Sequence, residues 1–486
     1  MSLSHSTTIS VLAACIGLEE GTGYSSFTII LILSFVVMYD SNGVKLHTLQ
    51  QVEETHHNKL ELELKLMLLS SESLLQLLQR FMKSSVQMKQ IHSVLITNGS
   101  LSTSNPSSFE WTTTLFYNTL IRAYLNLHLS QTTLLLFTHM LSHNIPPNAH
   151  TFTSITKAAS SNLTPPLLFH KSIYAQALKR GVLADPFLQT SFIHLYAQSR
   201  NLFSACKVFD EMCEPCIVSC NAMLDGFCKN GEMGSAALFF ESMPLKDVYS
   251  WTSFINGFVK NECYNSAIRI FQQMIMQRCL GDCFVKPNEA TFVSVLSACA
   301  NSTGVIGLSY GKQIHGYIIK NESRMSAFVG TALIYLYGKT DGLEYAMQVF
   351  ENLVNKEVCT WNAIIGTLAS NGKEKQAIDM FDKMIVEGQR PNEVTFVAVL
   401  TACARGELVE LGLQIFNSML AWFSIVPQME HYGCVVDLLG RAGFVAEAND
   451  FMRKMPFEPD ASVLGALLGA CKLHGKPPAY SMVSAV

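Results

Sequence analysis

A short unit recurs about every 35 residues from Thr114 to Asp460. Its fixed positions are an aromatic residue followed by Asn or Thr, then Ala, Phe and Met at spacings of i, i+4 and i+7, which lie on one face of a helix. Four copies show this face best: Ala205/Phe209/Met212, Ala236/Phe240/Met243, Ala267/Phe271/Met274 and Ala377/Phe381/Met384. Two short helices cannot bury such a face alone, so the copies must stack. The sequence therefore predicts an all-α solenoid of tandem helix-turn-helix units.

The composition agrees with a stacked array. Hydrophobic residues make up 49% of the 486 residues and charged residues only 15%, so each unit has enough apolar area to bury two faces. Because a solenoid grows by contacts between neighbours, the length predicts one elongated body instead of several domains. The net charge of −4 does not favour binding to phosphates by charge alone. Affinity for a nucleic acid would have to come from base contacts and local basic positions.

The first 74 residues do not share the repeat. No Lys or Arg precedes Lys45, so neither a basic signal region nor an Arg-rich presequence is visible. Phe27–Met38 is a continuous apolar run, but as a helix it would rise only ~18 Å against a hydrocarbon core of ~30 Å. We expect residues 1–74 to be a poorly ordered leader, or a wrongly placed start of the reading frame, and we expect no membrane association.

Aligning the copies on the aromatic-Asn/Thr step predicts ten tandem units over residues 114–460. A degenerate repeat over 75–113 precedes them, because Lys89–His92 (KQIH) recurs at Lys312–His315. Short units of about 31 residues alternate with standard units of about 35 and with longer units that carry Phe-x-x-(Val/Ile)-x-x-Ala. The units begin at Thr114, Ala149, Pro186, Ile217, Val248, Glu289, Ala327, Val358, Glu393 and Met429.

This alternation resembles the plant PLS-type pentatricopeptide repeat proteins, over about residues 75–475. The resemblance is carried by Val358–Ile365 (VCTWNAII), Arg390–Phe396 (RPNEVTF) and Gly311–His315 (GKQIH). A tetratricopeptide array also pairs helices, but it places Leu-Gly three and four residues after its Trp, whereas Gly comes later here. The resemblance implies a right-handed superhelix in which the first helix of each unit lines a concave groove.

The same resemblance implies that the fifth and last residues of a unit read one base of single-stranded RNA. In this chain the pairs are Asn118 with Asn148, Asn221 with Asp247, Thr252 with Asn288, and Asn362 with Asn392. An Asn amide both donates and accepts, whereas an Asp carboxylate only accepts and so favours a base that presents an N–H. Asn at a helix start is also an ordinary N-cap at any single site. Because four pairs follow the same pattern, the base-reading role is favoured over four unrelated N-caps.

By analogy with the family, Asn/Asn favours C or U, Asn/Asp favours U and Thr/Asn favours A. Two pairs depart from the usual Asn or Asp ending, Thr190 with Cys216 and Thr331 with Glu357, and the long units carry Val293 and Val397 at the fifth position. The expected RNA is, from 5′ to 3′, a pyrimidine, two unread positions, U, A, two poorly read positions and a pyrimidine. Val218, Tyr249 and Cys359, at second positions, either flank successive bases or pack in the core.

We expect no catalytic residue, metal or cofactor. The PLS subgroup often ends in a zinc-dependent cytidine deaminase, which needs His-x-Glu and Pro-Cys-x-x-Cys, and none of the 14 His residues begins a His-x-Glu. Cys213, Cys216 and Cys220 lie at a junction of two repeats and lack a second ligand pair. Cysteines inside repeats, such as Cys299, Cys403 and Cys471, are interpreted as buried small hydrophobes in a reducing compartment.

The end of the chain resembles the start of an extension motif. Residues 461–475 match it, with Leu464 where the family commonly has Trp. Residues 476–486 match nothing, and their two prolines would break a helix. Truncation or a frameshift is the simplest account of this tail.

The leading hypothesis is a non-catalytic, sequence-specific RNA-binding factor of a plant mitochondrion or chloroplast. It would position single-stranded transcripts for C-to-U editing or other processing by an editing deaminase or other enzymes supplied in trans, with no DNA partner. Two alternatives stay open. One is a protein-interaction scaffold, which predicts apolar or charged groove positions, and the other is a truncated, inactive remnant, suggested by the unusual ends and by Cys220 and Leu464 at aromatic positions.

Overall fold

The computed structural model describes residues 71–101, 110–161, 167–280, 285–302, 305–322 and 324–475. Every regular element in these ranges is helical: 23 α-helices and one short 3-10 helix, with no strand. The all-α prediction is confirmed. The run Phe27–Met38 and the tail 476–486 lie outside the described residues. Within them, no helix combines the length and the apolarity needed to cross a membrane.

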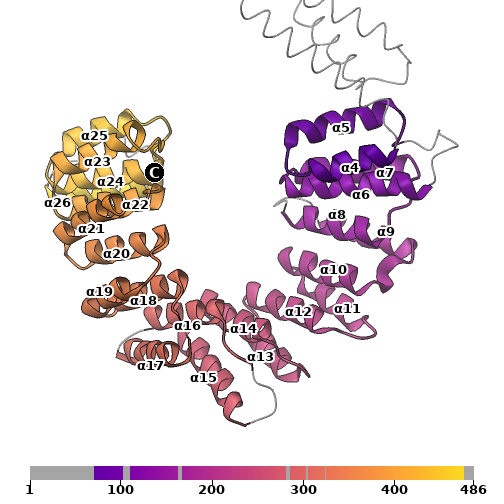
Figure 1. Ribbon diagram of the computed structural model, residues 1–486, viewed down its shortest axis with the longest axis horizontal. Helices are drawn as coiled ribbons and strands as arrows, with labels where there is room; N and C mark the ends of the chain where they lie inside the picture. Colours follow the sequence, from indigo (N-terminus) through magenta and orange to yellow (C-terminus); the bar gives the residue numbers. More distant parts are fainter. Residues whose placement is uncertain are drawn as a thin grey trace, which may run out of the picture. The chain divides into compact units, whose positions relative to one another are not determined.

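The helices follow one another as antiparallel pairs joined by short turns (Figure 1). The first helices of the pairs are α4 (Ser71–Arg80), α6 (Glu110–Asn126), α8 (Ala149–Ser161), α10 (Pro186–Gln198), α12 (Ile217–Lys229), α14 (Val248–Lys260), α16 (Glu289–Asn301), α18 (Ala327–Lys339), α20 (Val358–Ser370), α22 (Glu393–Arg405), α24 (Met429–Arg441) and α26 (Ala461–Leu473). The second helices are α5 (Ser85–Thr97), α7 (Ser130–Ser142), α9 (Leu167–Lys179), α11 (Leu202–Asp210), α13 (Met233–Ser242), α15 (Tyr264–Leu280), α17 (Val305–Asn321), α19 (Leu343–Asn352), α21 (Glu374–Val386), α23 (Val409–Ala421) and α25 (Val445–Arg453). A 3-10 helix, η1 (Val182–Ala184), precedes α10.

Nine first helices, from α8 to α24, begin at the residue where the sequence alignment starts a unit. Helix α6 is the exception, since it begins at Glu110, one turn before Thr114. Side-chain caps explain several of these starts. The carboxylate or amide oxygens of Asp247, Asn288 and Asn392 accept the backbone N–H of the third helical residue at 2.8, 2.9 and 3.0 Å. An N-cap of this kind satisfies a helix donor that would otherwise lack a partner.

Contacts divide the described chain into two compact units instead of the single body that the self-similarity predicts. The smaller contains the residues up to Leu129 together with His139–Ile145, and the larger contains Ser130–Thr138 and the residues from Pro146 onward. In a solenoid each repeat contacts only its neighbours, so a division can fall at any weak joint. Within the larger unit, each first helix from α8 to α24 packs on the first helix of the next pair.

The repeated Ala/Phe/Met face lies in the stack, as predicted. All four Ala residues are fully buried, and of the four Phe residues only Phe209 is half-exposed. Phe240 packs edge-on against Trp251 of the following first helix, with ring centroids 4.8 Å apart at 77°. Phe350 and Trp361 repeat this geometry with the same distance and angle. Burying each such aromatic side chain contributes about 1.5–3 kcal/mol, so the face stabilises the array.

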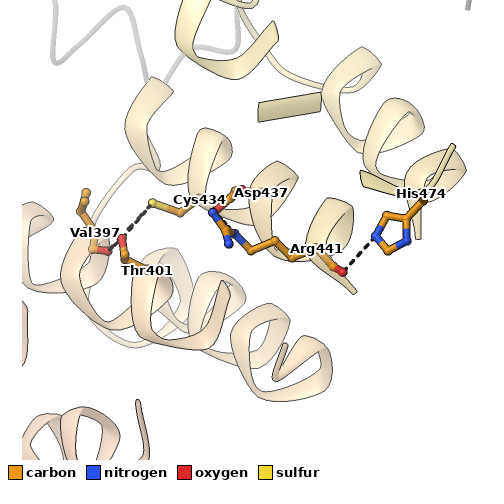
Figure 2. Close-up of polar contacts among 6 residues, drawn as sticks. All are labelled: Val397, Thr401, Cys434, Asp437, Arg441 and His474. Carbon is orange, nitrogen blue, oxygen red and sulfur yellow. Dashed lines mark hydrogen bonds and ion pairs between the residues drawn. The ribbon is translucent and has the colours of Figure 1, made fainter. Parts of the chain in front are cut away.

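A second set of contacts joins neighbouring first helices at their C-terminal ends. The Asn261 amide donates to the backbone carbonyl of Cys228, in the preceding first helix, at 2.9 Å. Asn230 and Asn371 make the equivalent contact at 2.8 and 2.9 Å. Figure 2 shows a His version at the end of the array, where His474 Nε2 lies 3.1 Å from the carbonyl oxygen of Arg441. Helix α26 therefore docks on α24 as a further first helix.

The two copies of the KQIH segment make the same tertiary contact. His92 Nδ1, in α5, lies 3.0 Å from the hydroxyl of Tyr124 in α6, within the smaller unit. His315 Nδ1, in α17, lies 2.9 Å from the hydroxyl of Tyr337 in α18. Both tyrosines are buried. The segment around His92 therefore occupies the place of a second helix of the repeat.

Candidate nucleic-acid interface

The predicted pair Asn221 and Asp247 meets at the start of a helix. Asn221 is the fifth residue of α12, and Asp247 is the N-cap of α14. The Asn221 amide nitrogen Nδ2 donates to Asp247 Oδ1 at 3.2 Å. A third residue that the sequence did not single out, Ser250, completes the group, because its hydroxyl donates to Asn221 Oδ1 at 2.6 Å.

The pair Asn362 and Asn392 repeats this arrangement two helix pairs from the end of the array. Asn362 Nδ2 donates to Asn392 Oδ1 at 3.0 Å, and Asn392 caps α22. The hydroxyl of Thr395 donates to Asn362 Oδ1 at 2.6 Å. Two separate sites thus share one hydrogen-bond geometry, which indicates that it is a property of the repeat.

Thr252 and Asn288 are linked through an intermediate. The Thr252 hydroxyl lies 2.6 Å from the hydroxyl of Thr291, which in turn contacts Asn288 Oδ1 at 2.8 Å. Because a Thr hydroxyl is shorter than an Asn amide, it reaches the residue at the third helical position but makes no direct hydrogen bond to the N-cap. The structure therefore brings this pair together indirectly.

The two unusual pairs are not joined by a hydrogen bond between their described side chains. Thr190 and Thr331 each donate to a carbonyl of their own helix, at 2.8 and 2.7 Å. Cys216 and Glu357 occupy the N-cap positions of α12 and α20, and the Glu357 side chain does not cap its helix. These two units therefore lack the hydrogen bond between fifth and last residues that joins Asn221 to Asp247 and Asn362 to Asn392.

Asn118 and Asn148, the first predicted pair, lie in different compact units of the chain. Asn118 lies in α6, in the smaller unit, and Asn148 lies directly before α8, in the larger. Asn148 Oδ1 accepts the backbone N–H of Thr151 at 3.1 Å, so it caps α8.

In the long units, Val293 and Val397 are half-buried on α16 and α22. Figure 2 shows Val397 beside Thr401, whose hydroxyl donates to its carbonyl at 2.7 Å.

Asp247 is the charged member of the best-formed pair. Burial alone would raise the pKa of its carboxyl, but donors from the Ser250 backbone and hydroxyl, the Asn221 amide and the Tyr249 backbone together lower that pKa below its usual value. The group is therefore a carboxylate at neutral pH. Its Oδ1 accepts from the Asn221 amide, the Ser250 backbone N–H and the Ser250 hydroxyl. Asn221 itself is only 5% exposed.

Large apolar side chains stand exposed at the second position of several first helices. Val218 and Tyr249 are 55% and 56% exposed, so the alternative that they are core residues is wrong. Cys359 is half-buried. The second residues of α10, α18 and α22, which the sequence reasoning missed, are also exposed: Phe187, Phe328 and Val394. Their signal in the sequence is a bulky residue two positions after the cap.

The cysteines divide into buried and exposed groups. Cys299, Cys403 and Cys471 are buried and free, as predicted, and burial raises the pKa of Cys299 to about 12. Cys213 and Cys216 are exposed at the junction before α12. Among the residues with a described position, no group of three or more His, Cys, Asp or Glu is arranged to hold a metal ion.

Comparison with known proteins gives the family. A PPR repeat model matches residues 190–215, 218–248, 249–279 and 394–422, and a PPR repeat family model matches 356–405. A putative pentatricopeptide repeat-containing protein of Arabidopsis thaliana is 50% identical over 406 residues, which are 84% of this chain and 85% of the relative. This chain belongs to the pentatricopeptide repeat family. Both matched models describe the repeats themselves, and the relative is named for its repeats and not for an enzymatic activity.

Two further pentatricopeptide repeat proteins of Arabidopsis thaliana are 43% and 40% identical, over 74% and 76% of this chain and 69% and 64% of their own lengths. The second of them is named chloroplastic. The crystal structure of the pentatricopeptide repeat protein PPR10 from maize is 15% identical, with a TM-score of 0.47 over 99% of this chain and 74% of that one.

A different family model, described as the Divergent PAP2 family, matches residues 1–95. Most of this stretch lies outside the described residues, and it is a small part of the chain. Its end overlaps α4 and α5, which pack on α6 and carry the His92–Tyr124 contact of the repeat. The contact of α5 with α6 is the same as that of α17 with α18.

Proposed function

We propose that this pentatricopeptide repeat protein binds single-stranded RNA and reads one base at each well-formed pair. The observation that carries the proposal is the group formed by Asn221, Asp247 and Ser250, which recurs with Asn362, Asn392 and Thr395. Repeat proteins of this family read one base per helical repeat with two or three side chains. Paired bases hide the edges that such side chains contact, so the ligand is single-stranded.

The chemistry at Asn221 and Asp247 favours U. Asp247 Oδ2 is a charged acceptor, and U presents an N–H at its Watson–Crick edge, whereas C presents a bare ring nitrogen there. Charge-assisted hydrogen bonds of this kind are about twice as strong as neutral ones. We assign A to Thr252 with Asn288, and a pyrimidine to Asn362 with Asn392. The pairs at Thr190 and Thr331 contribute little discrimination.

The exposed second-position residues supply the faces for stacking. Val218 and Tyr249 stand on α12 and α14, two first helices that pack against each other. A base held by Asn221 and Asp247 would lie between these side chains and would lose its contact with water on both faces. Contact between a base and an aromatic side chain contributes about 1–3 kcal/mol, which offsets the lack of a strongly basic surface.

The finer assignment is to the PLS class and its extension-bearing subgroup, with the repeat array over 114–460, a degenerate repeat over 75–113 and a partial extension motif over 461–475. Support comes from the alternating unit lengths and from α26, which docks as a further first helix. Two relatives are named chloroplastic and chloroplastic/mitochondrial. We infer an organellar role in which the bound transcript is presented to an editing deaminase or another processing enzyme in trans.

A selection from randomised RNA with the purified chain tests the binding proposal. The expected enriched sequence contains U-A, two unselected positions and then a pyrimidine. Enrichment of that pattern from a single-stranded pool, and not from the same pool annealed to its complement, supports base reading. Enrichment of no sequence above the starting pool would overturn the proposal and would favour the protein-interaction alternative.

A further inference from the structure

A buried hydroxyl occupies the third position of the helix that follows each well-formed pair. Ser250, Thr291 and Thr395 are each 0% exposed. Each hydroxyl accepts the backbone N–H of its own N-cap residue, at 3.2, 3.2 and 3.0 Å. A buried hydroxyl that donates no hydrogen bond costs about 1–3 kcal/mol of stability. Each of these hydroxyls therefore needs an acceptor for its single proton.

That proton has two candidate acceptors, and the nearer one is the amide of the preceding repeat. Ser250 Oγ lies 2.6 Å from Asn221 Oδ1 and 2.8 Å from Asp247 Oδ1. Thr395 Oγ1 lies 2.6 Å from Asn362 Oδ1 and 3.0 Å from Asn392 Oδ1. The same order of distances at both sites indicates that the hydroxyl donates across the repeat boundary.

The neighbouring groups determine which end of each amide faces the hydroxyl. The Asp247 carboxylate can only accept, so Asn221 must present its NH₂ to it and its oxygen to Ser250. At the second site the backbone N–H of Thr395 donates to the side chain of Asn392, which identifies the accepting atom as Oδ1. Asn362 must therefore also present its NH₂ to the cap and its oxygen to the hydroxyl. Neither amide can rotate by 180° without breaking two hydrogen bonds.

We propose that Ser250 and Thr395 are positioning residues for base reading, which hold the Asn221 and Asn362 amides in one orientation. This inference rests on the proposed function. With the hydroxyl in place, the amide offers a base one N–H and one oxygen lone pair in a constant order. Without it, the amide keeps only its hydrogen bond to the N-cap residue, so the direction of its donor and acceptor toward a base is fixed at one end instead of two. Loss of the hydroxyl should therefore reduce discrimination between U and C more than it reduces affinity.

The test uses the full chain and two RNAs that differ only in U or C opposite Asn221. Wild type should prefer the U-containing RNA. Ser250→Ala should reduce that preference by about threefold to tenfold, which corresponds to roughly 0.7–1.4 kcal/mol. Ser250→Thr should retain it, because the array itself uses Thr at this position in α16 and α22.

Thr360→Ala is the matched control. Thr360 is an equally buried hydroxyl at the third position of α20, but its neighbour across the boundary is Thr331, 3.4 Å away, and not an amide. Its removal should leave the U/C ratio at Asn221 unchanged, and an equal loss of that ratio in Thr360→Ala would overturn the inference. Circular dichroism of each variant reports whether the helices are intact. If Ser250→Ala does not fold, Thr395→Ala against Thr395→Ser applies the same comparison at Asn362.

Failure of the proposed RNA-binding function and failure of the positioning role of Ser250 would give different results. Wild type that binds neither RNA, or binds both equally, would overturn the proposed function. Wild type that prefers U, together with a Ser250→Ala variant whose affinities for both RNAs fall by the same factor, would show that Ser250 is only structural. A reduced ratio that Ser250→Thr restores supports the positioning role.

Discussion

The Asn261 side chain binds the backbone carbonyl of Cys228 at 2.9 Å and that of Gly257, in its own helix, at 2.8 Å. It thereby satisfies the C-terminal carbonyls of two neighbouring helices at once. Asn230 and Asn371 do the same at their own boundaries. This ladder runs along the C-terminal ends of the first helices, opposite the N-caps that belong to the proposed reading pairs.

Replacing Asn261 by Ala should destabilise the array. The two carbonyls lose their donor at a half-buried position, which costs about 1–3 kcal/mol. The measurement is the denaturant midpoint of unfolding, followed by circular dichroism. Asn352→Ala, at the exposed end of α19, is the control and should stay within about 0.5 kcal/mol of wild type. Equal midpoints for the two variants would show that the ladder does not stabilise the protein.

Replacing Asn221 by Thr should change the base that is read and leave the fold intact. A Thr hydroxyl at the fifth position of the unit is shorter than the amide and cannot present its donor and acceptor pair to a pyrimidine edge. We expect the preference opposite this residue to move from U toward a purine, with neighbouring positions unchanged. Binding to RNAs that carry each of the four bases there measures the shift. An unaltered order of preference would contradict the register.

Acidification should destabilise the helices around His92. Burial, with a smaller contribution from nearby His139, lowers the pKa of His92 to about 4 from 6.5. The folded state therefore holds this His neutral, whereas the unfolded chain protonates it below about pH 6.5. The stability it contributes is present above pH 6.5 and is lost as the pH falls toward 4, by up to about 3 kcal/mol.

His92→Asn should make this pH dependence less steep, because an amide can bind the Tyr124 hydroxyl without titrating; the other histidines whose pKa values burial also lowers keep the remainder. Thermal unfolding of both proteins between pH 7.5 and 5 is the measurement. A variant that loses stability as steeply as wild type over that range would show that His92 is not responsible.

Cys216 should be the more reactive of the cysteines around α12. Burial would raise the pKa of its thiol, but the Ser219 backbone and hydroxyl and the Val218 backbone lower it below the usual value. Burial raises the pKa of Cys228 to about 12. Because the thiolate is the nucleophile, iodoacetamide at pH 7 should label Cys216 well before Cys228, as followed by peptide mass spectrometry. Similar labelling rates would contradict the geometry at this helix start.

Periodicity alone predicted much of this molecule. The starts of nine first helices and the burial of the Ala/Phe/Met face follow from spacing along the chain, because a repeat places equivalent residues in equivalent surroundings. The pairing of Asn221 with Asp247 was implied by the resemblance to the family, and the two side chains share a hydrogen bond. Spacing also identified the KQIH copies, whose His side chains make the same contact with a buried Tyr.

Other features depend on which atoms meet across a repeat boundary, and spacing does not specify this. In the sequence Ser250 is an ordinary hydroxyl near a helix start, and Asn261 is an ordinary residue after a helix end. Only packing shows that one donates to Asn221 and the other to Cys228. The sequence by itself therefore determined the helices and the positions of the proposed reading pairs. The tertiary structure decided how those side chains are oriented, because a hydrogen bond requires a distance and a direction between residues that are far apart in the chain.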